Sequence, residues 1–525
     1  MAVVCSFCGG DVVEEQEITC VMPGGNPCSA CEERAIIRGQ IKRLEEEILK
    51  LKAKHYALGT TMNAIHDPFI HKLPPEISSY IFRVCLPILE FRTIHSEPVR
   101  KLLLRTLKLG AVCRKWRQLA WATPNLWAIL FLNIGPSTPL LKSLPGLIEE
   151  WLGRSGVLPL TIFFHQHDIY SERSETYEFA LKRIIEAMNL HSDRWRNLYL
   201  DVAVDIPERF SGSMHPNQLF RLDLAINGRR SLTQKFTMKF KPFPTHLTLR
   251  NFSPTSINIG WDDVTRATVY SLTPNECVEI MRRAPALECF RASEFITRSD
   301  DPTVNIDTFT AHPRLRSLNL SDKAAKFLNI IDVPSLEEWT HCSTGVRLPV
   351  NAMVSLLKRS SCCLKVLNLQ QVSANSNNLP ILFQAMPSLE RLQIHFRWST
   401  QHRNDAIDDI LGRIFRSPPD DIITSPADTN HEIFLPSLQF IECIAESERS
   451  TPIAWDQIPQ LYRQGHRRSL TLKSVTNKFQ TSDETALELL KLVDEGAKFL
   501  ISDNFGGGDF LANFRKRTGR EGNLS

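Results

Sequence analysis

Leu364-Lys365-Val366-Leu367-Asn368-Leu369 belongs to a series of short segments that share an L-x-x-L-x-L pattern. Its last two leucines alternate with a polar residue, which predicts a β-strand whose leucines point to one face. The other members of the series are 198–200, 219–224, 247–249, 287–290, 315–320, 336–339, 389–394, 438–441 and 470–472. The shared pattern predicts many short strands of one kind, spread over most of the chain.

Helical patterns stand between several of these segments. Thr273 is followed by Pro274 and then by Glu276, which is the arrangement of a capping box at a helix start. The stripes expected to be buried are Cys277, Ile280, Met281 and Ala284; Val350, Met353, Val354 and Leu357; and Ile407, Ile410, Leu411 and Ile414. Each stripe has the spacing of an amphipathic helix.

One strand and one helix in every 20 to 30 residues or so is the pattern of leucine-rich repeats. Such a unit cannot bury its apolar face alone, so the units stack into a curved solenoid with the strands on its concave side. We therefore predict an α/β solenoid of irregular leucine-rich repeats over residues 150–500. The repeat length varies, and the asparagine that usually follows the last leucine is mostly missing, so an open α/β sheet is the alternative.

Residues that alternate with the inward leucines should project from the concave face. They are Asn197, Tyr199, Arg221, Asp223, Thr248, Ser317, Asn319, Val366, Asn368, Arg391, Gln393 and His395. The substrate-binding candidates among them are Tyr199, Arg221, Asn319, Asn368, Arg391, Gln393 and His395. They mix polar, basic and aromatic types, which suits a protein partner but names none. Each could equally be a solvated strand residue.

A helical domain is predicted over residues 66–132. Pro74 and Pro75 suit the first turn of a helix, where missing amide donors do no harm. The apolar stripe that follows consists of Ile77, Tyr80, Ile81 and Val84. A second helical stripe consists of Leu109, Val112, Cys113, Trp116, Leu119 and Ala120. Periodicity alone fits an ordinary small helical domain.

Two cysteine pairs stand at the N-terminus, within residues 1–31. Cys5 and Cys8 form the first C-x2-C pair, and Cys28 and Cys31 form the second. Four thiolates at this spacing suit one structural zinc ion with closed tetrahedral coordination. Cys20 would be a spare or alternative ligand, while a redox pair and plain buried thiols are the rival interpretations.

Residues 32–62 have the pattern of a short coiled coil. The apolar seam consists of Ile37, Ile41, Leu44, Ile48, Leu51 and Leu58, and His55 fills one expected apolar position. Spacings of four and three residues between charged flanks predict an a/d seam and homodimerisation. The alternative is a single amphipathic helix that folds back on the neighbouring modules.

Composition narrows the class of protein. The chain has 525 residues, 42% of them hydrophobic, and a net charge of +4. These values are typical of a soluble folded protein and do not favour a dedicated nucleic-acid binder. We expect no secretory signal and no membrane span, and therefore the cytoplasm, the nucleus or both. Residues 501–525 are predicted to be a flexible tail.

The sequence of the helical region resembles the F-box domains of the large F-box protein families in mushroom-forming fungi. The resemblance lies in Leu73-Pro74-Pro75-Glu76-Ile77, Ile81-Phe82 and Val112-Cys113-Arg114-Lys115-Trp116, with Pro124 and Trp127 beyond them. It implies that a Skp-type adaptor of a cullin ubiquitin ligase binds Leu73, Pro74, Ile77, Ile81, Phe82, Val112, Cys113 and Trp116. The spacer 86–104 is longer than in a minimal F-box and is expected to be a loop.

No metalloprotease, hydrolase, Walker or dinucleotide motif is present in the sequence. The resemblance therefore implies a non-catalytic substrate receptor of a Skp-cullin-F-box ligase, with the repeats holding an unidentified target protein. The alternatives are a scaffold without a ubiquitin role, dimerised by its N-terminal helix, and a zinc-dependent nucleic-acid binder. The latter would show salt-dependent affinity carried by about the first 60 residues.

Overall fold

The computed structural model describes most of the chain, in two compact units. The described residues are 3–4, 11–12, 28–66, 73–86, 97–136, 138, 141–167, 173–227, 235–297, 310–343, 347–372, 378–396, 405–415, 434–445, 455–464, 470–476, 481–503 and 508–518. The first unit comprises Met1–Ile88 and Leu104–Thr123. The second comprises Leu89–Leu103 and Pro124–Ser525.

The first unit is mainly helical in its described part. A small antiparallel pair of β1 (Val3–Val4) and β2 (Asp11–Val12) precedes the long helix α1 (Ser29–His66). Then follow α3 (Pro75–Val84), α4 (Glu97–Val112) and α5 (Arg114–Trp121). Helix α1 therefore extends beyond the predicted 32–62 at both ends.

Two expectations for this region are wrong. The stripe predicted across 109–120 is divided between two helices, because Cys113 is extended (φ −154°, ψ 174°) and caps α5. Its Sγ accepts a hydrogen bond from the amide of Trp116 at 3.4 Å. The spacer 86–104 is a loop only in part, since α4 begins at Glu97. Pro98 falls in the first turn of α4, where proline is compatible with a helix.

The second unit contains one parallel sheet of fourteen strands among the described residues. Its spatial order follows the chain order. The strands are β3 (Ile129–Ile134), β4 (Leu160–Gln166), β5 (Trp195–Val202), β6 (Arg221–Ile226), β8 (His246–Arg250), β10 (Arg266–Tyr270), β11 (Cys289–Ser293), β13 (Ser317–Ser321), β15 (Glu338–Cys342), β16 (Val366–Val372), β17 (Arg391–Phe396), β18 (Phe440–Ala445), β19 (Thr471–Thr476) and β20 (Lys498–Asp503). This mixed α/β architecture is consistent with the predicted solenoid.

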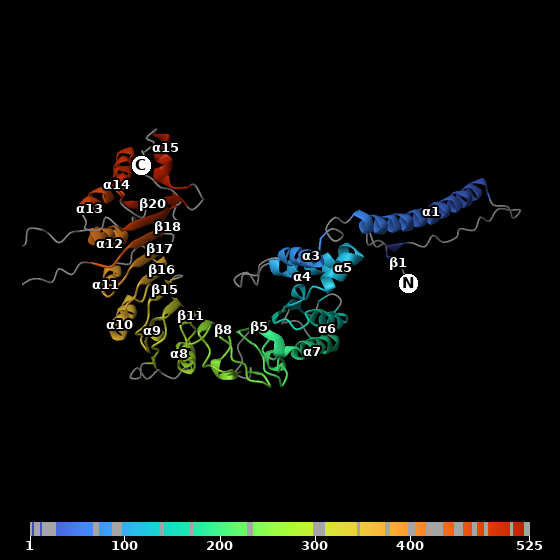
Figure 1. The fold of residues 1–525 in the computed structure, drawn as a ribbon, viewed down its shortest axis with the longest axis horizontal. Helices are drawn as coiled ribbons and strands as arrows, with labels where there is room; N and C mark the ends of the chain where they lie inside the picture. The colour runs from blue at the N-terminus through green and yellow to red at the C-terminus, as the bar shows by residue number, and fades with distance from the viewer. Residues whose placement is uncertain are drawn as a thin grey trace, which may run out of the picture. The chain divides into compact units, whose positions relative to one another are not determined.

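Helices lie between many of the successive strands, and one more follows the last strand. They are α6 (Leu144–Arg154), α7 (Glu175–Asn189), α8 (Pro274–Arg283), α9 (Ala325–Leu328), α10 (Val350–Ser360), α11 (Leu379–Gln384), α12 (Asp405–Phe415), α13 (Ile458–Gln464), α14 (Asp483–Asp494) and α15 (Phe510–Arg517). Helices α8 to α12 follow the outer side of the curved sheet (Figure 1). Two short pairs, β7 (Phe236–Thr237) with β9 (Ile257–Asn258) and β12 (Thr310–Ala311) with β14 (Ile331–Asp332), accompany it.

The parallel register stacks the inward side chains into two buried rows. The first row contains Leu130, Ile162, Leu198, Leu222, Leu247, Ala267, Phe290, Leu318, Trp339, Leu367, Leu392, Ile441, Leu472 and Phe499. The second contains Leu132, Phe164, Leu200, Leu224, Leu249, Val269, Ala292, Leu320, His341, Leu369, Ile394, Cys443, Ser474 and Ile501. Burying a large apolar side chain stabilises the fold by about 1.5–3 kcal/mol, so these rows are a main source of stability.

Buried and half-buried polar side chains join one repeat to the preceding one. Arg194 donates to the carbonyls of Leu152 and Leu158 and to that of Gly156, beyond the end of α6. His312 Nε2 lies 2.9 Å from the carbonyl of Ala284 after α8. Arg359 donates to the carbonyls of Leu328 and Ile331 after α9. Because the last carbonyls of a helix lack partners within it, these contacts satisfy groups that burial would otherwise leave unpaired.

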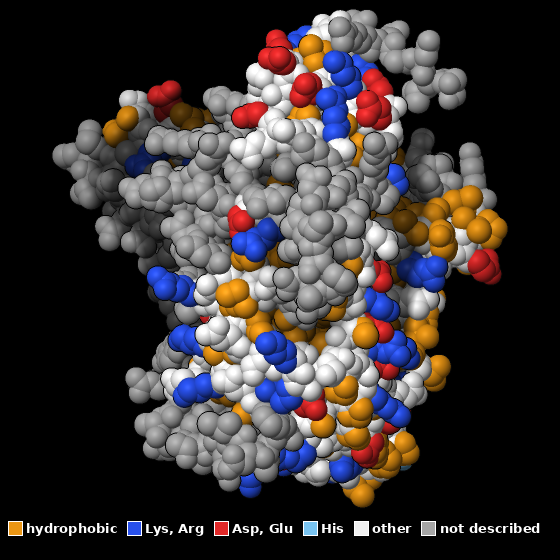
Figure 2. All heavy atoms as spheres, turned by 90° about the vertical axis from the view of Figure 1, so that its left-hand side faces the viewer, with side chains coloured by type: hydrophobic (Ala, Val, Ile, Leu, Met, Phe, Trp, Pro, Cys, Tyr) orange, Lys and Arg blue, Asp and Glu red, His pale blue; other side chains and the backbone are white. Residues whose placement is uncertain are grey.

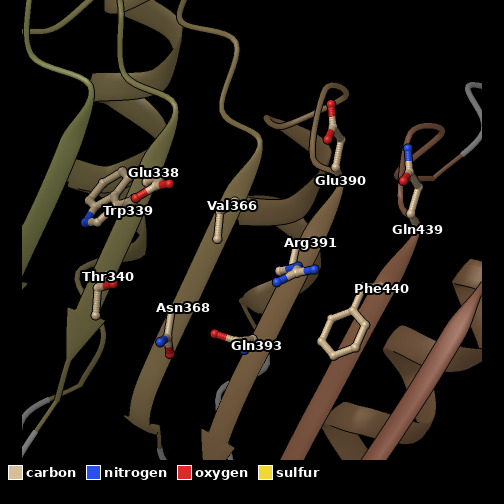
Figure 3. A pocket seen from close by; sticks show the side chains of 10 residues that line it. All are labelled: Glu338, Trp339, Thr340, Val366, Asn368, Glu390, Arg391, Gln393, Gln439 and Phe440. Atoms are coloured by element: carbon tan, nitrogen blue, oxygen red, sulfur yellow. The ribbon is translucent and has the colours of Figure 1, made fainter.

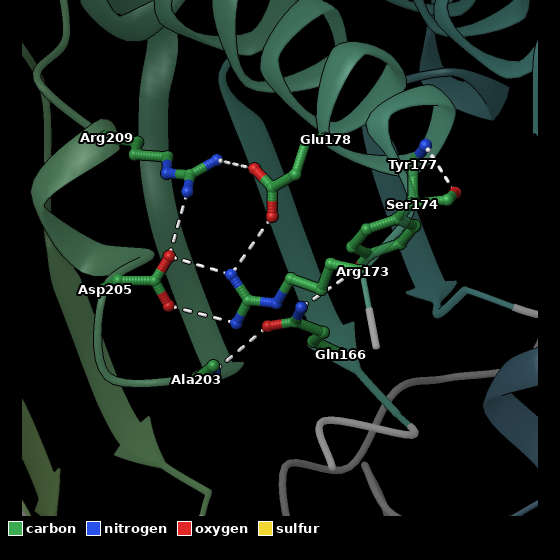
Figure 4. Close-up of polar contacts among 8 residues, drawn as sticks. All are labelled: Gln166, Arg173, Ser174, Tyr177, Glu178, Ala203, Asp205 and Arg209. Atoms are coloured by element: carbon green, nitrogen blue, oxygen red, sulfur yellow. Dashed lines mark hydrogen bonds and ion pairs between the residues drawn. The ribbon is translucent and has the colours of Figure 1, made fainter. Parts of the chain in front are cut away.

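A charged cluster fixes the start of α7 against the segment after β5. Arg173 forms a two-pronged ion pair with Asp205, at 2.8 and 3.0 Å, and also contacts Glu178 (Figure 4). Arg209 closes the ring by contacting Glu178 and Asp205. The hydrogen bonds that Arg173 donates to Asp205 raise the pKa of Arg173, so it stays a cation. Two cations and two carboxylates neutralise one another, which indicates a structural role.

Gln166 at the end of β4 adds a neutral link beside this cluster. Its Nε2 donates to the hydroxyl of Tyr177 at 2.8 Å, and its Oε1 accepts from the amide of Ala203 at 3.0 Å (Figure 4). Strand β4, helix α7 and the end of β5 are therefore held together by one buried amide.

The boundaries of the sheet differ from those predicted. The array begins at Ile129 in β3 rather than at 150, and the predicted helical domain 66–132 therefore runs into the sheet. The alternation in β3 is hidden because Phe131 is also apolar. The described part of the predicted tail 501–525 is not flexible coil, since it contains the end of β20 and all of α15. Asp509 caps α15, and Leu511 and Phe514 are buried.

The surface carries charges of both signs. Seen from the left-hand side of Figure 1, basic, acidic and apolar side chains of the described residues lie interspersed (Figure 2). None of the helices in the described residues combines the length and the apolar character that crossing a membrane requires.

Candidate functional site

The helical unit presents the first candidate surface. Pro74 is the residue before α3 and has an extended backbone, so the helix starts directly at Pro75. The ring of Phe82 packs on the ring of Trp116 at 4.8 Å, and Thr123 Oγ1 lies 3.0 Å from Ser79 Oγ. Helices α3 and α5 are thus packed together, whereas Ile77, Tyr80, Val84 and Trp121 remain exposed.

The predicted adaptor-binding residues divide by exposure. Pro74 is exposed, as are Ile77 (48%) and Val112 (51%). Leu73, Ile81, Cys113 and Trp116 are half-buried. Phe82 is only 2% exposed, so it belongs to the core between α3 and α5 and not to a contact face. Tyr80, at 56% exposed, is a further apolar surface residue of α3.

The outward face of the sheet presents the second candidate surface. Figure 3 shows Asn368, Arg391 and Gln393 on neighbouring strands, in front of the sheet, with helices behind it. All seven predicted substrate-binding residues alternate with the inward rows, so all belong to this face. They lie in separate places: Tyr199 beside Arg221 at one end, Asn319 in the middle, and the others on β16 and β17.

A pocket of about 450 Å³ lies on β15 to β18. Its lining residues are Glu338, Trp339, Thr340, Val366, Asn368, Glu390, Arg391, Gln393, Gln439 and Phe440 (Figure 3). Arg391 lies over the ring of Phe440 at 4.9 Å. Sequence patterns placed Val366, Asn368, Arg391 and Gln393 on this face, but not Glu338, Glu390 or Phe440. Glu338 and Phe440 occupy outward positions of their strands, and Glu390 directly precedes β17. The same alternation, together with the residue before each strand, would therefore have identified all three.

Hydrogen bonds hold the floor of this pocket. Gln393 Nε2 donates to Glu442 at 2.8 Å, and Lys473 Nζ contacts the same carboxylate at 2.7 Å. Glu442 is 7% exposed, so these two partners replace contacts with water that burial removes from its carboxylate. The pocket therefore combines fixed amides, carboxylates and a guanidinium group, which can bind the polar side chains or backbone of a protein segment.

An aromatic cluster occupies the other end of the face. Phe131, Phe163 and Tyr199 lie on β3, β4 and β5, and Phe163 stacks on Tyr199 at 4.3 Å with ring planes 13° apart. Their exposed fractions of 2–6% show that they are buried despite pointing outward. Burial raises the pKa of Tyr199, whose hydroxyl therefore stays neutral. Tyr199 acts here as a packing residue more than as a free contact residue.

Arg221 is anchored beside this cluster. It lies over the ring of Tyr199 at 5.4 Å and pairs with Asp223 at 3.2 Å. Burial raises the pKa of Asp223, although Arg221 opposes that shift. The pairing restricts Arg221, so its predicted contact with a substrate would require this arrangement to open.

A basic group of three further arginines lies between the two ends. Arg250, Arg266 and Arg291 are outward residues of the adjacent strands β8, β10 and β11. Arg250 lies over the ring of Tyr270 at 4.6 Å. Burial, together with Arg266 and Arg221, lowers the pKa of His246, which keeps that imidazole neutral. These residues were missed by the sequence prediction, although the same alternation places them on this face.

The predicted zinc ligands lie largely outside the described residues. Cys5 and Cys8 are outside them, as is the side chain of Cys31. Cys28 is described: its carbonyl accepts from the amide of Glu32 at 3.0 Å, at the start of α1. Among the described side chains, no group of three or more His, Cys, Asp or Glu could hold a metal ion.

No family model matches this chain, and no curated protein matches it significantly. The function therefore has to be inferred from the two surfaces themselves.

Proposed function

We propose that this chain is the substrate-recognition subunit of a Skp-cullin-F-box ubiquitin ligase. In this proposal the exposed apolar residues of α3 and α4 bind a Skp-type adaptor, and the outward face of the sheet binds a target protein. The observation that carries it is the exposure of Ile77 and Val112, two large apolar side chains of the helical unit that the resemblance assigns to adaptor contact. Exposed apolar side chains on a small module suit a protein interface.

In this role the chain supplies binding and no catalysis. The adaptor-bound helical unit and the target-bound sheet would bring a ubiquitin-carrying partner close to the target. Proximity raises the effective concentration of the reacting groups without a catalytic residue in the receptor. We place this activity in the cytoplasm or the nucleus, where such ligases act.

The target would lie along the outward face of the sheet. The pocket on β15 to β18 offers hydrogen-bonding and charged groups, and Arg250, Arg266 and Arg291 offer positive charge on β8, β10 and β11, beyond the intervening strand β13. A protein segment that carries acidic residues at one end and hydrogen-bonding groups at the other would complement this order of charges.

The N-terminal cysteines fit the same proposal as a structural element. One zinc ion held by Cys5, Cys8, Cys28 and Cys31 would fold the short segment before α1. Thiolate ligands in a closed tetrahedral site add stability and no catalytic position.

Co-expression with a Skp-type adaptor, followed by size-exclusion chromatography with light scattering, tests the proposal. We expect a one-to-one complex. Val112→Asp should abolish it, as should the double change of Leu73 and Pro74 to alanine. The matched control is Leu107→Asp, since Leu107 is a 38% exposed apolar residue of the same helix α4 outside the predicted contact set.

A folded protein that elutes without the adaptor would reject the receptor proposal. It would favour the scaffold alternative, in which the helical unit has no ubiquitin role. The specific observation behind that alternative is the exposed apolar seam of α1, which does not depend on adaptor binding.

A further inference from the structure

Helix α1 carries a narrow apolar seam in solvent. The helix has 38 residues and is therefore about 57 Å long. The seam consists of Ile37 (48% exposed), Ile41 (50%), Leu44 (59%), Ile48 (49%), Leu51 (58%) and Leu58 (54%). A helix that packs on a globular domain usually needs a broader apolar face than two positions in seven. The seam is narrow enough to suit another helix of the same kind.

We propose that the seam binds the seam of a second copy of this chain, in a parallel two-stranded coiled coil. The residue types favour two strands. β-branched Ile41 and Ile48 occupy a positions, whereas Leu44, Leu51 and Leu58 occupy d positions. Isoleucine at a with leucine at d favours a parallel dimer over trimers and tetramers.

Charge complementarity sets the parallel orientation. In a parallel pair, each g residue meets the e residue of the following heptad on the other helix. Glu47 at g would thus meet Lys52 at e, and Glu33 at g would meet Arg38 at e. Both combinations have opposite signs, and the two-fold symmetry repeats each of them.

His55 fixes the register of the two helices. It occupies an a position, so an in-register dimer places the two imidazoles opposite each other. A polar residue at a single a position specifies register at some loss of stability.

Light scattering on the full chain over a range of concentrations tests the dimer. Leu51→Asp places a charge in the seam and should raise the dissociation constant by at least about 10-fold. Leu49→Asp is the matched control, because Leu49 is also an exposed leucine of α1 (67%) but lies outside the seam. It should leave the dimer unchanged. A monomeric wild-type chain at tens of micromolar, or equal loss in both variants, would overturn the proposal.

A charge exchange tests the orientation. Glu47→Lys and Lys52→Glu should each weaken the dimer about 3- to 10-fold, because each creates like-charged pairs across the interface. The double exchange should restore wild-type affinity, because it re-forms the pair with its signs reversed. Two weakened single variants without restoration in the double variant would reject the parallel arrangement. This experiment involves no adaptor, so its result is independent of the proposed ligase function.

Discussion

His341 and Leu369 lie directly opposite each other in the parallel pair of β15 and β16. Both belong to the second buried row, where His341 also pairs with Leu320 on β13. His341 is 1% exposed, and neither ring nitrogen has a hydrogen-bond partner in the described structure. An imidazole thus stands in a row of apolar side chains, and burial lowers its pKa to about 4.

Replacing this histidine should stabilise the protein. We expect His341→Leu to raise the free energy of unfolding by about 1–3 kcal/mol, because it removes two buried polar atoms without partners. The thermal unfolding midpoint measures the effect. Leu369→His is the reciprocal control and should destabilise. A lower midpoint for His341→Leu would mean that the imidazole makes a contact that leucine cannot replace.

The same histidine should make stability depend on pH. Its folded pKa of about 4 lies below the ordinary value of 6.5, so the unfolded chain binds more protons between these two pH values. The contribution of neutral His341 to stability is therefore complete above about pH 6.5 and is lost as the pH falls towards 4. The loss is on the order of 3 kcal/mol. Denaturant unfolding across this range should show a shallower pH dependence for His341→Leu than for the wild type.

The core of the helical unit should depend on Phe82. Truncation to alanine removes the ring that packs on Trp116 and leaves a cavity, so we expect a loss of about 3–5 kcal/mol. Ile77→Ala on the exposed face of α3 should change stability by only about 0.5 kcal/mol. Circular dichroism of adaptor-free protein separates the two. Equal effects would contradict the assignment of Phe82 to the core.

The stability of the protein should depend on the ion pair between the buried carboxylate of Glu442 and Lys473. Lys473→Met leaves Glu442 without its 2.7 Å ion pair, and we expect a loss of about 1–3 kcal/mol. Adding Glu442→Gln should recover much of this loss, since the amide needs no counter-ion. Chemical denaturation of the two variants provides the comparison. If the double variant were no more stable than Lys473→Met, the charge of Glu442 would not be the cause.

The cysteine pairs should bind metal. We expect about one zinc ion per purified chain by atomic emission, and near zero for a variant with Cys8→Ser and Cys28→Ser. Cys363→Ser is the control, because Cys363 is an exposed cysteine remote in sequence from the predicted ligands. Its zinc content should match the wild type. A metal-free wild-type chain purified without chelators would contradict the zinc prediction.

The recurring leucine pattern was sufficient to predict the position of most strands of the sheet. Each segment in the predicted series overlaps a strand, although most begin about two residues before it, and the capping box at Thr273 begins α8 as expected. Strands β3, β4, β10 and β20 were missed. In β3 and β4 apolar residues also fill outward positions, and in β10 the small Ala267 stands where leucine was expected. Local patterns fail where burial on both faces removes the contrast between them.

The candidate surfaces were less predictable than the fold. The sequence pattern predicts Cys113 to be one more member of an apolar stripe, but this residue follows the end of α4 and caps α5. Tyr199 reads as an outward contact residue, yet it is buried between Phe163 and Arg221. Both outcomes depend on neighbours that are far away in the sequence or on a change of backbone direction, and side-chain periodicity contains neither.

The sequence by itself determined ten of the fourteen strands of the sheet, which side of those strands faces inward, and the a/d seam of α1. These features follow from periodicities of two and of about three and a half residues, which are local properties of the chain. The tertiary structure decided which side chains from different strands become neighbours. The register of β15 against β16 places His341 opposite Leu369, and the stacking of β15 to β18 gathers Arg391, Gln393 and Phe440 around one pocket. Such neighbours arise because parallel strands align residues that lie tens of positions apart, and no local pattern specifies that alignment.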